Sequence, residues 1–240
     1  MSPIARRLTM ATLLLISAGF VRLGIWQLSR LHQRRAANIV AIAARGAPPV
    51  PIVAGSTGTD TLAEHYVVAH GRYDHERDIL VRSAVLDGAP GVEVVTPLLL
   101  ADGGPAVLVN RGFLPAPDAV SAVTEGTEEP GPQTVRGLAL PLGAAAGEPV
   151  AHAGRTTWRR LDLEALRQRL PYPILPVYIL QSPDSSLPKF PRRLEAPAVD
   201  EGPHLSYAIQ WFLFAGLALA FAILVVGRTA GQSDGRTAAK

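Results

Sequence analysis

Residues 204–226, HLSYAIQWFLFAGLALAFAILVV, decide the fold, because from Leu205 onward this segment runs for 22 residues without a charged side chain. One helix of about 20 apolar residues is long enough to cross the hydrocarbon of a bilayer. The segment therefore predicts a transmembrane helix. Three polar or aromatic side chains near its start, His204, Tyr207 and Trp211, are spaced by three and four residues, which places them on one helical face.

A second apolar segment lies near the other end of the chain, at residues 8–28, LTMATLLLISAGFVRLGIWQL. It could be a signal peptide, but it is longer than the usual apolar core and lacks a cleavage site formed by small residues. We therefore expect an uncleaved transmembrane helix. Apolar residues recur at helical spacing through residues 29–46, so the helix should continue to Gly46.

Arg22 interrupts the first apolar segment about four turns after its start. Its long aliphatic stem could bring the guanidinium to the membrane surface beside Trp26, one turn further on. The alternative is that Arg22 holds an anionic group of a ligand. The sequence leaves both interpretations open.

Residues 47–203, between the two apolar segments, have the pattern of a small folded domain that is rich in strands. Six short runs of Val, Ile, Leu and Tyr are separated by turn residues: 66–73, 78–83, 91–100, 106–114, 133–140 and 176–181. Residues 162–170 predict one amphipathic helix. We expect an antiparallel sheet or small barrel with one or two helices, and exposed loops at 116–132 and 143–154.

These segments together predict an integral membrane protein of the α+β class, in which two transmembrane helices flank a β-rich domain on one side of the membrane. The expected order is a terminal tail, a first span, a helical extension, the domain, a second span and a closing tail. Their bounds are residues 1–7, 8–28, 29–46, 47–203, 204–226 and 227–240.

The charge distribution and the absence of cysteine exclude several classes of protein. Residues 44–203 carry 14 Lys and Arg against 19 Asp and Glu, a net charge of −5, so the basic character belongs to the two ends. A nucleic-acid-binding domain shows the opposite distribution. Without cysteine the chain has no disulfide, no thiol catalysis and no thiolate metal site. The Lys and Arg residues do not decide which side of the membrane the domain occupies.

No common catalytic motif is present in the sequence: there is no GxSxG elbow, no phosphate-binding Walker loop and no HExxH. His65, His70 and His75 are evenly spaced and could suggest a metal site. In a regular strand, however, His70 would face the opposite side from the other two, so joint ligation needs a kink. Exposed positions in a hairpin are the alternative interpretation.

The tripeptide Asn110-Arg111-Gly112 follows an apolar run and has two interpretations. Arg111 could hold a carboxylate of a ligand through its planar guanidinium. Alternatively, the tripeptide could form a bulge in which Gly112 takes an unusual backbone angle and Arg111 pairs with an acid of the domain.

Polar and aromatic side chains gather where the first apolar segment ends and the second begins: Trp26, Gln27, His204, Tyr207, Gln210 and Trp211. An aromatic belt at a membrane surface would explain the Trp and Tyr residues. It does not explain His204. A neutral imidazole at this place could be an axial ligand of a haem, or it could cap the helix or form a hydrogen bond at the interface.

Four motifs in this order resemble the surfeit-locus family of cytochrome c oxidase assembly proteins, called Shy-type in yeast. They are LGIWQLSR at 23–30, TPL at 96–98, VLVNRGFLP at 107–115 and HLSYAIQWFLFA at 204–215. Their order and spacing match the family over essentially the whole chain, with an apolar helix at each end.

The resemblance implies a non-enzymatic assembly factor of the bacterial plasma membrane. Its termini would be cytoplasmic, its domain would lie on the periplasmic or extracellular side, and its partners would be the oxidase catalytic subunit and the haem-synthesis enzymes. Bacterial members are thought to bind haem a, so His204 becomes the expected iron ligand. We expect Trp26, Gln27, Tyr207 and Trp211 to line the site and Arg22 or Arg111 to meet the propionates; Asn110, Gly112 and Gln210 match other family positions.

Three other functions remain open at this point. The protein could stabilise an oxidase assembly intermediate without binding haem. It could be a membrane-bound enzyme that acts on haem or a quinone, although no acid–base group is evident. An anchored ligand sensor is the third, but only 14 residues follow Val226, which is too short for a signalling module.

Overall fold

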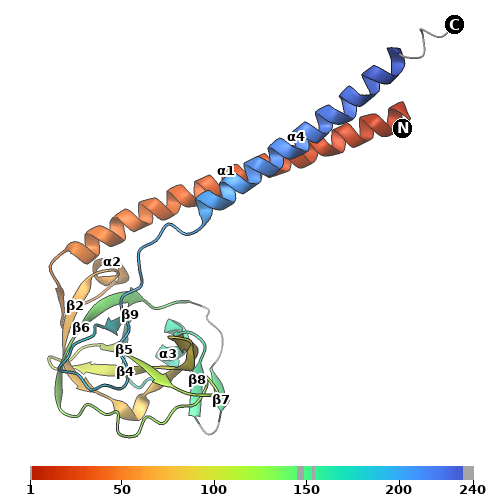
Figure 1. Ribbon diagram of the computed structural model, residues 1–240. Helices are drawn as coiled ribbons and strands as arrows, with labels where there is room; N and C mark the ends of the chain where they lie inside the picture. The colour runs from red at the N-terminus through yellow and green to blue at the C-terminus, as the bar shows by residue number, and fades with distance from the viewer. Residues whose placement is uncertain (1, 145–148, 153–154, 235–240) are drawn as a thin grey trace. The chain divides into compact units, whose positions relative to one another are not determined.

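A computed structural model describes residues 2–144, 149–152 and 155–234 of the 240-residue chain. The chain divides into two compact units (Figure 1). Unit 1 contains residues 1–40 and 199–240, and unit 2 contains residues 41–198. Each unit is described by itself.

Unit 1 is an antiparallel pair of long helices, α1 (Pro3–Gly46) and α4 (His204–Asp234), the first of which continues into unit 2. Figure 1 shows the two helices side by side, with the N-terminus and the C-terminus of the chain at the same end of the pair. Both helices are long and apolar enough to cross a membrane. The predicted helix over residues 29–46 is continuous with the apolar segment before it.

The two helices pack along a seam of small and aromatic side chains. On α1 the seam residues recur at spacings of three and four: Ser17, Phe20, Gly24, Gln27 and Leu31. On α4 its buried alanines are spaced by seven: Ala208, Ala215 and Ala222. This is the period of an antiparallel helix pair of the coiled-coil type, in which small residues allow the backbones to approach closely.

Three contacts show how close the helices are. The Ser17 hydroxyl donates a hydrogen bond of 3.0 Å to the carbonyl oxygen of Ala215. A methyl group on Gly24 would lie 2.7 Å from the ring of Phe212. Phe20 and Trp211 stack with their ring centroids 5.6 Å apart. The sequence of the seam therefore fixes the rotation of α4 about its own axis relative to α1.

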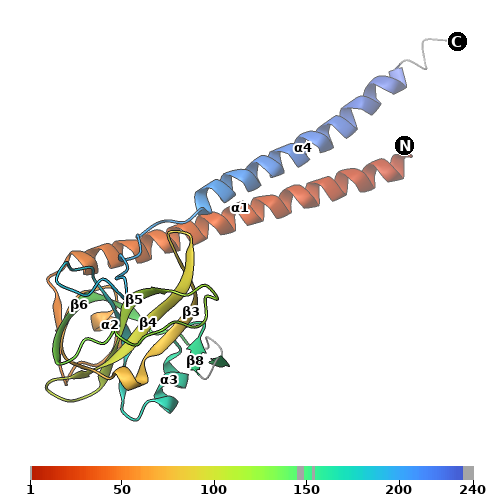
Figure 2. The ribbon, with the colours of Figure 1, turned by 60° about the horizontal axis from the view of Figure 1, so that its bottom comes forward.

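Unit 2 is built around a closed barrel. Its strands are β1 (Val50–Ile52), β2 (Tyr66–Tyr73), β3 (Ile79–Leu86), β4 (Ala89–Leu100), β5 (Ala106–Pro115), β6 (Pro132–Pro141), β7 (Val150–His152), β8 (Arg155–Trp158) and β9 (Ile174–Gln181). The barrel order is β2-β6-β9-β5-β4, and pairing of β4 with β2 closes it. Strand β1 adds to β2, while β3, β8 and β7 continue the sheet beyond β4. Figure 2 shows β3 and β4 as a long twisted hairpin.

The prediction of a small barrel is confirmed, but the expected antiparallel pairing holds for only part of the sheet. Strands β5 and β9 pair in parallel, as do β1 with β2 and β3 with β8. Parallel neighbours need a crossover connection rather than a tight turn. Between β5 and β9 the chain runs through β6, β7, β8 and α3 (Leu163–Arg169), which makes the long return. Turn signals in the sequence reveal hairpins but not such distant pairings.

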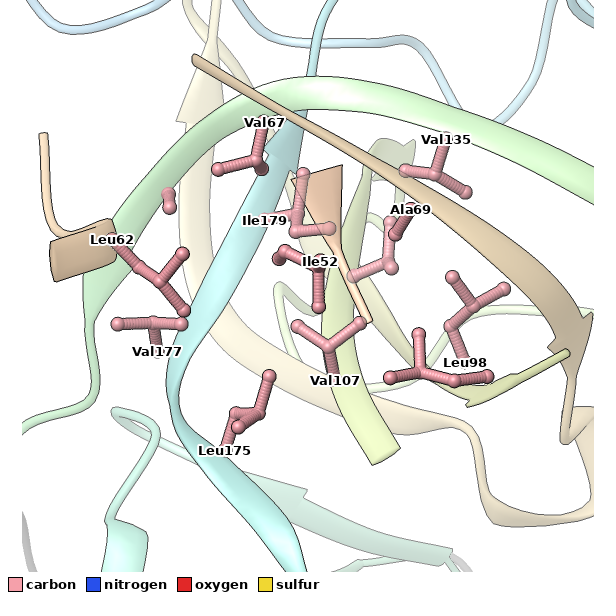
Figure 3. Close-up of a cluster of buried hydrophobic side chains, with 13 residues drawn as sticks. Ile52, Leu62, Val67, Ala69, Leu98, Val107, Val135, Leu175, Val177 and Ile179 are labelled. Carbon is pink, nitrogen blue, oxygen red and sulfur yellow. The ribbon is translucent and has the colours of Figure 1, made fainter. Parts of the chain in front are cut away.

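The core of unit 2 fills the barrel. Figure 3 shows Val67, Val107 and Ile179, from three different strands, pointing into one cluster. A second cluster packs α3 through Leu166 against Trp158 and neighbouring strand residues. Asp162 caps α3 by accepting a hydrogen bond of 2.9 Å from the backbone N–H of Ala165.

The six predicted strands correspond to β2, β3, β4, β5, β6 and β9, and the predicted amphipathic helix to α3. Both glycine-containing hairpin turns are also present, with positive φ at Asp87, Gly88, Gly103 and Gly104. The sequence did not predict the short strands β1, β7 and β8 or the single turn α2 (Thr59–Leu62). Three or four residues are too few to show a periodicity.

A β-bulge in β5 sets the direction of Arg111. In the pairing of β5 with β4, Val94 lies opposite Gly112 and Val95 lies opposite Asn110, which leaves Arg111 as the extra residue. Gly112 has a φ of +117°, and a methyl group there would lie 2.1 Å from the carbonyl oxygen of Arg192. Only glycine fits this position.

Replacing Gly112 with alanine should strongly destabilise unit 2, because the new Cβ would add a backbone clash to an unfavourable φ. We expect a loss of about 3 kcal/mol or more, which lowers the unfolding midpoint by about 6–12 °C. The measurement is thermal unfolding of the full chain in detergent, followed by the circular dichroism of the strands. Gly126→Ala is the control, since Gly126 also has a positive φ, of +82°, but apart from its two chain neighbours no residue has an atom within 4 Å of the place that a Cβ would take. A loss in Gly112→Ala no larger than in the control would contradict this account of the bulge.

Candidate functional site

His204 is the first residue of α4. Pro203 precedes it and ends the extended segment, and the carbonyl oxygen of Pro203 accepts a helical hydrogen bond of 3.1 Å from the N–H of Tyr207. The imidazole of His204 lies in the seam between the helices, where its Nδ1 is 2.9 Å from Oε1 of Gln27 on α1. The structure thus joins two residues that are 177 positions apart in the sequence.

The tautomer of His204 follows from the placement of the Gln27 amide oxygen toward the ring. The amide oxygen of Gln27 can only accept, so Nδ1 of the imidazole carries the proton. In the neutral ring, Nε2 then has a free lone pair. Metal-binding histidines have the same arrangement, with one ring nitrogen on the metal and the other donating to an oxygen. The arrangement at His204 therefore suits a ligand of a metal such as a haem iron.

The other predicted residues of unit 1 fall into two groups. Trp211 lies in the seam, where it stacks on Phe20. Trp26 and Tyr207 are exposed, at 53% and 46% of their surface, and Gln210 is exposed as well. The structure brings His204, Gln27 and Trp211 to one seam and leaves the others on outer faces of the helices.

Arg22 is also exposed. It is two residues from both Phe20 and Gly24, which places it on the side of α1 opposite the seam.

A solvent-open hollow of about 320 Å³ lies next to His204. It is lined by Arg30, Gln33, Arg34 and Ala37 of α1 and by Asp200, Gly202 and His204 of the segment that leads into α4. Hydrogen bonds tie this segment to α1. Asn38 and Arg34 donate to the carbonyl oxygen of Asp200, at 2.7 and 3.3 Å.

An ion pair beside the hollow strengthens this attachment. Both carboxylate oxygens of Glu201 accept hydrogen bonds of 2.8 Å from Arg35. Arg35 lowers the pKa of the Glu201 carboxyl through this contact. The pair is exposed, so it positions the segment more than it stabilises the fold.

Unit 2 contains a separate buried polar cluster centred on Glu129. Arg111 is 0% exposed and donates to Glu129 through Nε at 3.1 Å and through Nη2 at 2.8 Å. Arg193, 9% exposed, pairs with the same carboxylate oxygen. The guanidinium of Arg111 also lies 5.1 Å from the ring centroid of Tyr73. One acid therefore compensates two buried cations.

Hydrogen bonds of the tripeptide at 110–112 hold the backbone beside this cluster in position. Asn110 accepts a hydrogen bond of 2.9 Å from the N–H of Gly112 and donates one of 2.6 Å to Glu93. The geometry corresponds to the second sequence interpretation, a bulge with Arg111 paired to an acid of the domain. The sequence did not identify Glu129 or Arg193 as partners. The expectation that residues 116–132 form an exposed loop is wrong at Glu129, which is 6% exposed.

Further groups surround the cluster. Burial raises the pKa of Asp78, although the Thr96 hydroxyl donates to its carboxylate and Arg111 lies close to it. Burial also raises the pKa of Tyr73. Nε2 of His75 accepts the N–H of Glu129 at 3.1 Å. Through Glu129, the cluster therefore holds the segment before β6 against the barrel.

The three evenly spaced histidines have different partners. Nδ1 of His65 is 3.1 Å from the carbonyl oxygen of Ala63, and Nδ1 of His70 is 3.0 Å from the Thr134 hydroxyl. His75 binds the Glu129 backbone. Within residues 2–144, 149–152 and 155–234, no group of three or more His, Cys, Asp or Glu could hold a metal ion. The geometry gives the metal interpretation of these histidines no support.

A model of the SURF1 family matches residues 14–216, which include both the seam and the barrel. The chain belongs to the SURF1 family. This is the surfeit-locus family of cytochrome c oxidase assembly proteins, so the resemblance noted in the sequence is confirmed. The matched range contains Gln27, Arg111 and His204.

Individual SURF1 relatives align over most of the chain. A SURF1-like protein of Monosiga brevicollis is 26% identical over 89% of this chain and 85% of its own. Surfeit locus protein 1 of Takifugu rubripes is 26% identical over 83% of this chain and 89% of its own. An uncharacterised SURF1-like protein of Mycobacterium tuberculosis is 28% identical over 83% of this chain and 74% of its own.

Removing the charge of Glu129 should destabilise the barrel of this SURF1 protein, because Arg111 and Arg193 would remain buried without an anion. We expect Glu129→Gln to lose about 3–5 kcal/mol, measured by urea unfolding of the full chain in detergent. Glu128→Gln is the matched control, since the neighbouring Glu128 is exposed. Equal unfolding midpoints for the two variants would show that Glu129 does not hold the cluster.

Proposed function

We propose that this protein is a membrane-anchored assembly factor of cytochrome c oxidase that binds haem a and assists its insertion into the catalytic subunit. Membership of the SURF1 family supports the assembly role. The observation that carries the haem-binding part is the hydrogen bond between His204 and Gln27, which leaves Nε2 of a neutral imidazole as a lone-pair donor.

In this proposal α1 and α4 are the two membrane spans, at residues 8–28 and 204–226. Their length and apolar composition support this, and their antiparallel packing is consistent with both chain ends on one side of the membrane. The tails at 1–7 and 227–240 would be cytoplasmic. Residues 47–203 would form the extracytoplasmic domain, in the plasma membrane of a bacterium.

The residues of unit 1 fit a haem better than a bare metal ion. A haem iron needs one or two axial ligands from the protein, and a neutral histidine is a common one. A bare ion would need three or four protein ligands, and His204 has one neighbour, Gln27, that is a weak ligand. Haem a, when bound, supplies the iron and a flat apolar ring. His204 would ligate the iron, Gln27 would hold its tautomer, and Trp211 would offer aromatic surface in the same seam, whereas Tyr207 and Trp26 lie on outer faces of the helices.

The arginines first expected at the propionates contribute less to this proposal. Arg111 is wholly buried and its guanidinium already serves Glu129. Removing it from that carboxylate would leave buried charges without partners, which is costly. Arg22 lies opposite the seam on α1. We therefore place neither residue in the haem site.

The partners of the proposed factor are the oxidase catalytic subunit and the haem-synthesis enzymes. The factor would accept haem a from the haem-synthesis enzymes and present it to the oxidase catalytic subunit. His204 lies at the start of α4, so a haem on its Nε2 would be held at an edge of the helix pair rather than enclosed within a domain.

A second candidate function is an interaction protein that stabilises an assembly intermediate without binding haem. An apolar hollow of about 510 Å³ favours it, because this surface on unit 2 could receive a partner. Its apolar lining comes from Leu86, Ala89, Phe113, Pro115 and Phe190. This function predicts that the oxidase subunit copurifies while haem does not.

The two functions are distinguished by purifying the full chain from cells that make haem a and recording its absorption spectrum. We expect haem a to be bound in the wild type. His204→Ala should reduce the amount of bound haem a at least about tenfold. Removing a residue that only hydrogen-bonds to a metal ligand already costs about tenfold in affinity or more, and removing the ligand itself should cost at least as much. The matched control is His32→Ala, an exposed histidine of α1. Wild-type stoichiometry and spectrum in His204→Ala would refute ligation by His204.

A further inference from the structure

Arg30 and Arg34 form a pair on one face of α1. Four residues separate them, so their side chains lie on the same side of the helix, one turn apart. Both line the hollow whose other wall includes His204 and Gly202. Two guanidinium groups and the imidazole that would ligate an iron therefore border the same solvent-open space.

The hollow keeps a positive charge because the arginine pair has no acidic partner. Among the residues that the structure describes, neither Arg30 nor Arg34 forms an ion pair with a carboxylate. Arg30 donates to the neutral side chain of Gln33 at 3.1 Å, and Arg34 donates through Nε to the backbone carbonyl of Asp200. Glu201 pairs with Arg35. The Asp200 carboxylate also lines the hollow and accepts the N–H of Gly202 at 2.8 Å, so one acid faces two guanidiniums there.

Most donors of the two guanidiniums remain available to a ligand. Each guanidinium has five N–H groups, and the contacts above use one from each residue. A planar guanidinium binds a carboxylate through two parallel hydrogen bonds, which a lysine cannot reproduce. Two arginines one turn apart therefore suit a ligand that carries two carboxylates, or one carboxylate shared between them.

We propose that Arg30 and Arg34 bind the propionate carboxylates of the tetrapyrrole whose iron His204 ligates. This inference rests on the proposed function, because it assigns a second part of the same ligand. A haem combines the two chemistries that the hollow offers, a metal centre for an imidazole nitrogen and two carboxylates for guanidiniums. The phosphate of an anionic lipid could bind the two guanidiniums but would make no contact that requires the imidazole.

The test compares two ligands that differ only in their carboxylates, haem b and its dimethyl ester. Each is titrated into full-length protein in nanodiscs of phosphatidylcholine, for the wild type and for Arg30→Gln/Arg34→Gln. We expect the double variant to bind haem b roughly tenfold more weakly, from two partly exposed ion pairs of up to about 1 kcal/mol each. It should bind the dimethyl ester as the wild type does.

Two controls make the result specific. Arg6→Gln/Arg7→Gln removes the same charge from the other end of α1 and should bind both ligands as the wild type does. Arg30→Lys/Arg34→Lys retains the charge without the planar fork and should recover only part of the lost affinity. The single variants Arg30→Gln and Arg34→Gln give the same comparison in case the double variant does not fold.

The outcomes separate this inference from the proposed function. An equal loss for haem b and its ester, or no loss for either, overturns the role of the arginine pair while the binding of haem to His204 stands. If the double variant binds haem b more weakly than the wild type only when phosphatidylglycerol is added to the nanodiscs, the arginine pair binds lipid phosphate, and the inference is overturned. Failure of the wild type to bind either form of haem b overturns the inference, whereas the proposed function is overturned only if haem a is also absent from the protein purified from cells that make it.

Discussion

The close packing of α1 against α4 is the constraint on which the proposed site depends. Gly24 leaves room for the ring of Phe212, and Ala208 and Ala215 are buried in the same seam. Small residues at these positions allow the helices to approach, and the heptad period holds their rotation. Gln27 is therefore directed at His204 rather than at solvent. A larger residue at Gly24 would separate the helices and remove the hydrogen bond that sets the tautomer of the imidazole.

The barrel depends on a different constraint, the burial of one carboxylate between two arginines. Such a cluster adds little stability over an apolar core of the same size, but it is costly to break. It can therefore specify a conformation. Here it holds together the bulge of β5, the segment before β6 and the segment that leads toward α4. The cluster explains why a chain segment with few large apolar residues, 116–131, is fixed at Glu129.

Much of this architecture was predictable from the sequence because it depends on local signals. The strands of the barrel are short runs rich in Val, Ile, Leu and Tyr, Asp87-Gly88 marks a hairpin, and the long apolar helices are evident. The parallel pairing of β5 with β9 was not predictable, since nothing local encodes a partner about 70 residues away. In the site, the sequence identified His204 and Gln27 but not their hydrogen bond. The spacing of His204, Tyr207 and Trp211 places them on one side of α4, but it did not reveal that Tyr207 is exposed while Trp211 stacks on Phe20.

The central claim is that Gln27 holds the Nδ1–H of His204 while Nε2 binds the iron. It is tested most directly by the iron–histidine stretching band in the resonance Raman spectrum of the ferrous, haem-loaded protein. Loss of the acceptor should make the imidazole a weaker donor. The account predicts a lower frequency in Gln27→Leu and an unchanged frequency in Gln210→Leu, where the glutamine lies exposed on α4. The same frequency in the wild type and in both variants would contradict it.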